Sequence, residues 1–174
     1  MTLKIPRDEE WTLETDQLLL SPISARDAEP LFELLKEPAL HSFTGGAPPS
    51  ALQVLERRIS LWEHRQSPEG DEVWLNWTLR RKADRVVVGY LQVTIRASQA
   101  ELAWVIGIPF QGRGYAKEAS RRVVGWLRER LEIGELRANI HPKHAASQAV
   151  AKHIGLHPSP EITAEGEVVW VSSH

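Results

Sequence analysis

The spacing of hydrophobic and polar residues along the first third of the chain predicts one strand and two helices. Residues 18–23, LLLSPI, form a short apolar run that ends in a proline, which is typical of a strand. Apolar residues then recur at helical spacing over residues 24–38 and again over residues 50–62. The segment 44–50, TGGAPPS, has the composition of a loop between the two helices.

The middle of the chain has strand periodicity. Apolar and polar side chains alternate over residues 73–80, and residues 86–95 follow after the turn KADR, so the two segments predict a hairpin. Residues 101–108 are apolar on both faces after Glu101. A strand of this composition is expected to be central and buried.

Four further elements follow. The pattern predicts a helix over 115–131, a strand over 136–141, a helix over 145–154 and a strand over 167–172. The order of elements is β-α-α-β-β-β-α-β-α-β. It predicts an α/β (α+β) single domain over residues 1–174 with a mixed, largely antiparallel sheet.

Composition narrows the class of function. The chain has 174 residues, a formal net charge of −2, 42% hydrophobic residues and no cysteine. The near-neutral charge disfavours a nucleic-acid partner, and the absence of cysteine excludes disulfides and a thiolate nucleophile. The N-terminal residues carry no long apolar run, so we expect a cytoplasmic protein with no membrane partner.

The stretch IPFQGRGYAKEA joins the predicted central strand to the helix that follows it. Gly112 and Gly114 would let an anion approach the unpaired N–H groups of the helix start, and Arg113 and Lys117 add positive charge nearby. A dinucleotide fingerprint would need a third glycine at Lys117, and a P-loop would need Gly-Lys-Ser/Thr. The same turn could also be a purely structural connection.

The stretch QGRGYA fits the pattern Q/R-x-x-G-x-G/A, with Gln111, Gly114 and Ala116 in its defining places. This pattern resembles the coenzyme A pyrophosphate signature of the GNAT superfamily of N-acetyltransferases. AELAWVIGIPFQGRGYAKEA and HPKHAASQAVAKHIGL are similar to segments of its RimJ/RimL-like branch, the ribosomal-protein N-acetyltransferases. The chain departs from that branch at His144, where asparagine is usual, at Leu156, where phenylalanine is usual, and after Pro158.

The resemblance implies a GNAT-like fold whose central strand pair splays apart. It implies an acetyltransferase that uses acetyl-CoA and no metal, and that acetylates a primary amine by direct attack in a ternary complex. The amine acceptor would be a protein N-terminus or a small molecule, and a homodimer is compatible with this reading. The implied CoA contacts are Trp104, Val105 and Ile106 for pantetheine, Gln111, Gly112, Arg113, Gly114, Tyr115, Ala116 and Lys117 for pyrophosphate, and His144.

Two residues are candidates for catalysis. Glu101 would act through water as the general base for the amine, or would be an edge carboxylate paired with Arg or Lys. Ser147 would donate a proton to the departing thiolate, bind CoA, or bond its own helix backbone. A tyrosine four residues later is common in the superfamily, but Ala151 occupies that position here.

Other residue patterns leave alternatives open. The histidines at 141, 144, 153 and 157 resemble a zinc pattern, but the nine-residue helical separation of His144 and His153 is too long for one ion. Trp62, Trp74 and Trp77 would wall an acceptor cleft or fill the core. The loop HSFTGGAPPS would form part of the acceptor rim. Alternatives to the enzyme are a non-catalytic CoA-binding or regulatory module and a nucleotide-binding protein.

Overall fold

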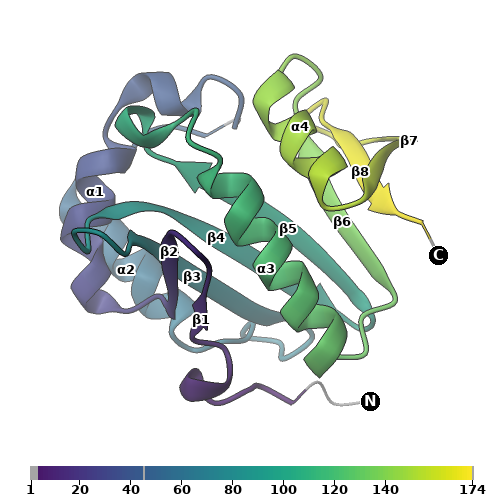
Figure 1. The fold of residues 1–174 in the computed structure, drawn as a ribbon, viewed down its shortest axis with the longest axis horizontal. Coiled ribbons are helices and arrows are strands. Elements are labelled where there is room, and N and C mark those ends of the chain that lie inside the picture. The colour runs from purple at the N-terminus through teal and green to yellow at the C-terminus, as the bar shows by residue number, and fades with distance from the viewer. Residues whose placement is uncertain (1–3, 45, 174) are drawn as a thin grey trace.

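An eight-stranded sheet forms the centre of the molecule (Figure 1). The computed structural model describes residues 4–44 and 46–173. Within them the strands lie in the order β1-β2-β3-β4-β5-β6-β8-β7. Their bounds are β1 Leu13–Glu14, β2 Leu18–Pro22, β3 Val73–Arg81, β4 Val87–Arg96, β5 Gln99–Ile106, β6 Glu135–Ile140, β7 Leu156–Ile162 and β8 Val168–Ser172.

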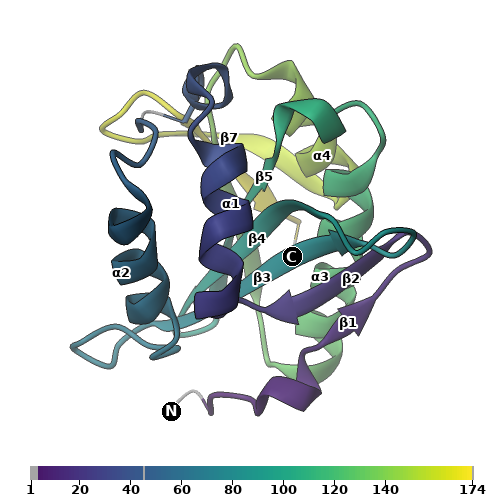
Figure 2. The ribbon, with the colours of Figure 1, turned by 90° about the vertical axis from the view of Figure 1, so that its left-hand side faces the viewer.

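Helices cover both faces of the sheet. Helices α1 (Ala28–Leu35) and α2 (Leu52–Trp62) lie on one face (Figure 2), and α3 (Tyr115–Arg130) and α4 (Ala145–His153) lie on the other. Short 3-10 helices precede α1 and follow α1, at η2 (Ala25–Asp27) and η3 (Pro38–His41). Two others are η1 (Asp8–Glu10) and η4 (Ile108–Phe110). The predicted mixed, mostly antiparallel α/β fold is confirmed.

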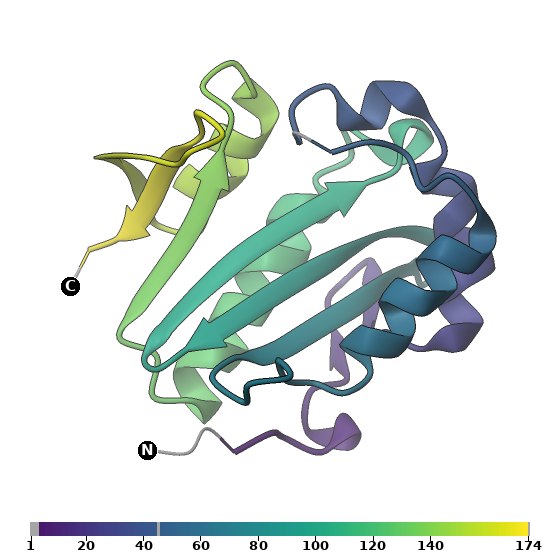
Figure 3. The same cartoon turned by 180° about the vertical axis from the view of Figure 1, so that it is seen from behind.

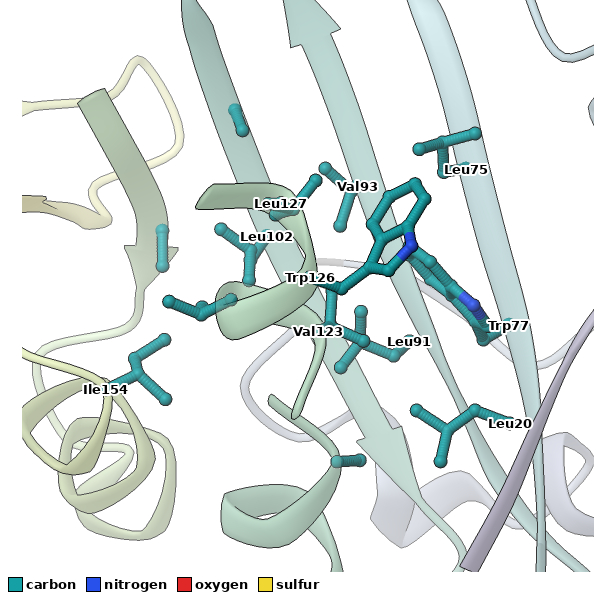
Figure 4. Packing of buried hydrophobic residues seen from close by; sticks show 14 of the residues in the cluster. Leu20, Leu75, Trp77, Leu91, Val93, Leu102, Val123, Trp126, Leu127 and Ile154 are labelled. Carbon is teal, nitrogen blue, oxygen red and sulfur yellow. The ribbon is translucent and has the colours of Figure 1, made fainter. Parts of the chain in front are cut away.

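The larger hydrophobic core lies between α3 and the sheet (Figure 4). Val123, Trp126 and Leu127 of α3 are buried there together with strand residues such as Leu91. The Trp77 ring meets the Trp126 ring edge-on, with ring centroids 5.9 Å apart. Trp77 is fully buried and donates a 2.6 Å hydrogen bond to the Trp11 carbonyl, so it belongs to the core and not to a cleft wall.

The buried carboxylate of Asp27 fixes the start of α1 against the sheet. It accepts hydrogen bonds from the backbone N–H of Ser24 at 2.9 Å and from the Thr78 hydroxyl at 2.9 Å. It also pairs with the guanidinium of Arg80 on β3. Because a buried charge needs partners of this kind, the network holds α1 in a defined place above β3 and β4.

Two strands were not predicted from the hydrophobic pattern. Strand β1 has only two residues, and β7 contains Pro158 and Pro160, which have no N–H to give to a ladder. Strand β7 lies at the edge of the sheet and pairs with β8, with a register shift between Pro158 and Ile162, and edges and irregular pairings are positions where a strand tolerates proline. The prediction for residues 101–108 also needs correction, because β5 covers Gln99–Ile106 and Ala103 is exposed.

Strands β5 and β6 separate after a short parallel ladder (Figure 3). They pair only where Gln99–Glu101 face Glu135–Arg137. Beyond Glu101, β5 stays paired with β4 as far as Ile106, whereas β6 pairs with β8. One backbone edge of β5 therefore faces a widening gap instead of a neighbouring strand.

Candidate active site

A cleft of about 400 Å³ lies at the gap between β5 and β6. Its walls come from β4, β5 and β6, from α4, from Arg58 of α2 and from the segment that connects α1 to α2. The predicted residues Glu101, Trp104, Val105, His144 and Ser147 all line it. The fold thus brings together residues that lie more than forty positions apart in the sequence.

The glycine turn lies at the end of β5. Gly112 and Gly114 have φ angles of +76° and +81°, in the left-handed region that favours glycine. Within the described part of the chain, no hydrogen bond to another protein group uses the backbone N–H groups of residues 112–117. These N–H groups and the exposed Arg113 and Lys117 side chains form a cradle suited to an anion.

Side chains behind the turn hold it in place. The Gln111 amide donates a 2.9 Å hydrogen bond to the Ile106 carbonyl, so it ties the turn to the last residue of β5. The Arg81 guanidinium lies 5.3 Å from the centroid of the Phe110 ring. Its hydrogen bond to Asp84, followed by one to the buried Tyr115, raises the pKa of Arg81. Arg81 and Phe110 lie outside the QGRGYA motif, so the motif does not predict that they support the turn.

Glu101 is exposed at the point where β5 and β6 separate. Arg137 faces it in the parallel ladder but forms its ion pairs elsewhere, at 3.5 Å with Glu135 and at 2.5 Å with Glu161. Among the ion pairs of the described residues, none includes Glu101. The alternative of an edge carboxylate paired with Arg or Lys therefore finds no support here.

A second carboxylate, Glu167, lines the same cleft. Burial raises the pKa of Glu167, and the negative charges of Glu165 and Glu101 raise it further. Glu167 comes from the connection between β7 and β8, where its backbone N–H bonds the Thr163 hydroxyl at 3.1 Å. No sequence pattern indicated a site role for this residue, because the pairing of β7 with β8 that carries it toward Glu101 leaves no periodic signal.

Ser147 and two predicted neighbours form a connected group. The Trp104 indole N–H donates a 3.2 Å hydrogen bond to Ser147 Oγ, and His144 Nε2 lies 3.4 Å from the same oxygen. Burial lowers the pKa of His144, and the nearby His141 lowers it further, so a neutral imidazole is favoured. The Ser147 hydroxyl therefore contacts two side chains of the cleft. These contacts differ from the third alternative given for Ser147, which was a hydrogen bond to its own helix backbone.

The connection between α1 and α2 extends across the cleft to α4. The Phe43 ring stacks on the His144 ring at a centroid distance of 4.8 Å and an interplanar angle of 19°. Phe43, Thr44, Gly46 and Ala47 line the cleft, and the remaining glycine at position 45 lies outside the described residues. The loop therefore lies where a rim was expected.

Trp62 packs beside this region on Tyr90, whereas Trp74 donates its indole N–H to Glu72.

The described ranges contain neither a metal-binding cluster nor a helix that could span a membrane. Over residues 4–44 and 46–173, no three His, Asp or Glu side chains come together in an arrangement that could hold a metal ion. Each helix in this part of the chain is too short or too polar to cross a membrane.

Comparison with known proteins identifies the family. The sequence profile of the Acetyltransferase (GNAT) domain matches residues 17–157. The chain is 27% identical over 168 residues to "Uncharacterized protein YkkB" of Bacillus subtilis, an alignment that covers 86% of this chain and 87% of YkkB.

Solved structures share the fold. A spermidine N-acetyltransferase from Vibrio cholerae in complex with CoA and spermine has a TM-score of 0.74 at 15% identity, covering 90% of this chain and 94% of that one. A putative ribosomal-protein-serine acetyltransferase from Vibrio cholerae has a TM-score of 0.70 at 22% identity, covering 92% and 96%. The profile match spans most of the chain, and the chain therefore belongs to the GNAT family of acetyltransferases.

Proposed function

We propose that the protein is an acetyl-CoA-dependent N-acetyltransferase that acetylates a primary amine in a ternary complex. One observation carries the proposal: the open edge of β5 and the Glu101 carboxylate, which forms no ion pair with any described residue, border the same cleft. Membership of the GNAT family supports acetyl transfer as the general type of reaction. The motif similarity described above favours the RimJ/RimL-like branch within it.

The residues present fit acetyl-CoA. The N–H groups of residues 112–117 would hold the pyrophosphate, with Arg113 and Lys117 as nearby cations. The open edge of β5 at Trp104, Val105 and Ile106 would pair with the amide groups of pantetheine. When bound, acetyl-CoA supplies the acetyl group as a reactive thioester, and His144 would contact the cosubstrate from α4.

Glu101 would supply the proton acceptor. An amine that attacks a carbonyl must first lose the proton of its ammonium form, and a carboxylate that acts through water can take it. The carbon–nitrogen bond then forms while the carbon–sulfur bond breaks, and the departing thiolate receives a proton. The free backbone N–H groups of β5 are suited to stabilise charge on the carbonyl oxygen.

Ser147 would supply the proton for the thiolate. Its oxygen accepts the Trp104 N–H, which leaves the hydroxyl proton available for donation. His144 Nε2 lies 3.4 Å from the same oxygen. The acylated nitrogen carries a surplus proton after the C–N bond forms, and the loss of that proton through water restores the Ser147 hydroxyl. Tyrosine cannot play this part at position 151, because the residue there is a buried alanine.

Replacing Ser147 by alanine tests this assignment. If the hydroxyl acts as the C–S bond breaks, Ser147→Ala lowers the maximal rate by roughly 10-fold or more and changes the Michaelis constant for acetyl-CoA little. Steady-state kinetics with acetyl-CoA varied at saturating acceptor provide the measurement. Ser60→Ala, an exposed change on α2, is the control. A higher Michaelis constant at the wild-type maximal rate would instead assign Ser147 to binding.

The proposed function is tested by an acceptor screen. The protein is mixed with acetyl-CoA and with peptides, amino acids, a polyamine or an aminoglycoside, and free thiol release is followed together with the mass of the product. We expect at least one class to accelerate thiol release, with an acetylated amine formed in equal amount. Binding of CoA without turnover of any class would favour the non-catalytic CoA-binding module, and displacement of CoA by ATP would favour nucleotide binding.

A further inference from the structure

The cleft carries opposite charges at two ends of the paired strands β4 and β5. Glu101 lies opposite Thr94 in the β4–β5 ladder, and Glu167 lines the cleft near it. Four residues along the strand, Val105 lies opposite Tyr90, and Arg58 of α2 lines the cleft at that end. Strands β4 and β5 form the floor of this part of the cleft. The carboxylates lie at one end of the floor and the guanidinium lies at the other.

Arg58 is exposed and available. Among the described residues, the arginines at 65, 80, 81, 96 and 137 are each engaged with an acidic side chain, whereas Arg58 forms no such ion pair. Arg58 and Trp62 are one helical turn apart on α2, so they share a face of the helix. The Trp62 ring lies 6.1 Å from the Tyr90 ring, which places this face of α2 over Tyr90.

Tyr90 offers a second donor at the same end. Burial raises the pKa of its hydroxyl, and the positive charge of Arg58 opposes this rise. The hydroxyl therefore stays protonated at neutral pH and forms no hydrogen bond with another described residue. A guanidinium beside a free hydroxyl donor is a pair of groups suited to a carboxylate.

The floor between the two ends is small and polar. Ala103 is exposed there, and it lies opposite Gln92 in the ladder. Gln92 donates its amide to Asn76 at 2.8 Å, which fixes its side chain. Tyr90 and Thr94 are four residues apart, or roughly 13 Å along the strand. Because the charged groups line the cleft at two ends of this floor, a molecule that contacts both needs polar groups at two separate ends.

We propose that the acceptor is a zwitterionic amine, whose ammonium group faces Glu101 and Glu167 and whose carboxylate binds Arg58 and Tyr90. This inference rests on the proposed function and narrows its substrate class. The carboxylate could belong to a free amino acid or to an acidic residue next to a peptide N-terminus. A polyamine fits less well, because its second ammonium group would lie against the Arg58 guanidinium.

Matched acceptors test the inference. The ratio of kcat/KM is measured for an ω-amino acid and for its amide, which is similar in size but uncharged at that end, and a diamine and an acidic N-terminal peptide are compared in parallel. We expect the acid to exceed the amide by about 10- to 100-fold, as for a hydrogen bond to a charged group. A preference for the peptide over the free amino acid would assign the carboxylate to a protein acceptor.

Arg58→Gln should reduce this ratio to near one, and Tyr90→Phe should reduce it partly. Arg57→Gln removes an exposed arginine from the preceding position of α2, which does not line the cleft, and should keep the wild-type ratio. A ratio that stays at its wild-type value in Arg58→Gln, or a wild-type protein that prefers the diamine, would overturn the inference while acetyl transfer stands. A protein inert toward every amine would instead remove the proposed function.

Discussion

Glu101→Gln lowers the maximal rate of acetyl transfer by about 10²–10⁴-fold at neutral pH. The substitution keeps the size of the side chain and removes its basicity. Affinity for acetyl-CoA stays nearly intact, because Glu101 borders the cleft at the far end of β5 from the glycine turn. Initial rates at saturating substrates, together with equilibrium binding of CoA, provide the measurement.

The size of this deficit should depend on pH. As pH rises, a growing share of the free amine has already lost its proton to water, so the reaction needs a base less and the deficit shrinks. The profile has to be read with the titratable groups that line a cleft together with Glu101, among them Glu161, Glu167 and His141, and with the positive charges of Arg96 and Arg137. A deficit that is the same at every pH would mean that Glu101 only positions the acceptor.

Glu167→Gln is the matched control. Glu167 lines the same cleft, and burial together with the negative charges of Glu165 and Glu101 raises its pKa. We expect it to contribute to attraction of the ammonium group, so its loss should raise the Michaelis constant of the acceptor more than it lowers the maximal rate. If Glu167→Gln shows the larger loss of rate, Glu167 would replace Glu101 as the base.

Gly114→Glu should abolish acetyl-CoA binding and leave a folded protein. The new carboxylate would occupy the anion cradle at the start of α3. A Cβ atom at Gly114 meets no other atom within 4 Å, so the change causes no clash. The positive φ adds backbone strain of about 1–2 kcal/mol. Calorimetric titration with CoA and thermal unfolding by circular dichroism separate the two effects.

Gly70→Glu controls for strain and charge together. Gly70 has a φ of +74°, has no atom within 4 Å of an added Cβ, and lies in the connection between α2 and β3. It should reproduce the loss of thermal stability of Gly114→Glu while CoA affinity stays at its wild-type value. CoA binding by Gly114→Glu at wild-type affinity would exclude the glycine turn as the pyrophosphate site.

The hydrophobic pattern predicted most elements of the fold because each has a clear period. The helix predicted over 115–131 is observed as α3 at Tyr115–Arg130, and the two glycines of the turn before it have positive φ angles. Strand β7 was missed because its prolines oppose strand propensity, and they are accommodated by its edge position and by the register shift between Pro158 and Ile162. The hydrophobic pattern of a segment does not show whether that segment lies at the edge of a sheet.

The site was predictable where a residue lies within a segment whose local motif can be recognised. Glu101, Ser147 and the glycine turn lie in segments that resemble the family, and the fold places the first two in one cleft. Arg58 and Glu167 come from α2 and from the β7–β8 connection. Their approach depends on tertiary packing, and a single sequence does not report which separate segments meet.

The separation of β5 from β6 also has a consequence for the behaviour of the protein in solution. Backbone amides on the open edge of β5 lack a strand partner, so they should exchange hydrogen with solvent faster than the amides that β5 shares with β4. A ligand that pairs with this edge would slow their exchange and add to the free energy of unfolding, by about 2.7 kcal/mol at a hundredfold excess over its Kd. The resistance of the protein to heat and proteolysis would then follow the concentration of its acyl donor.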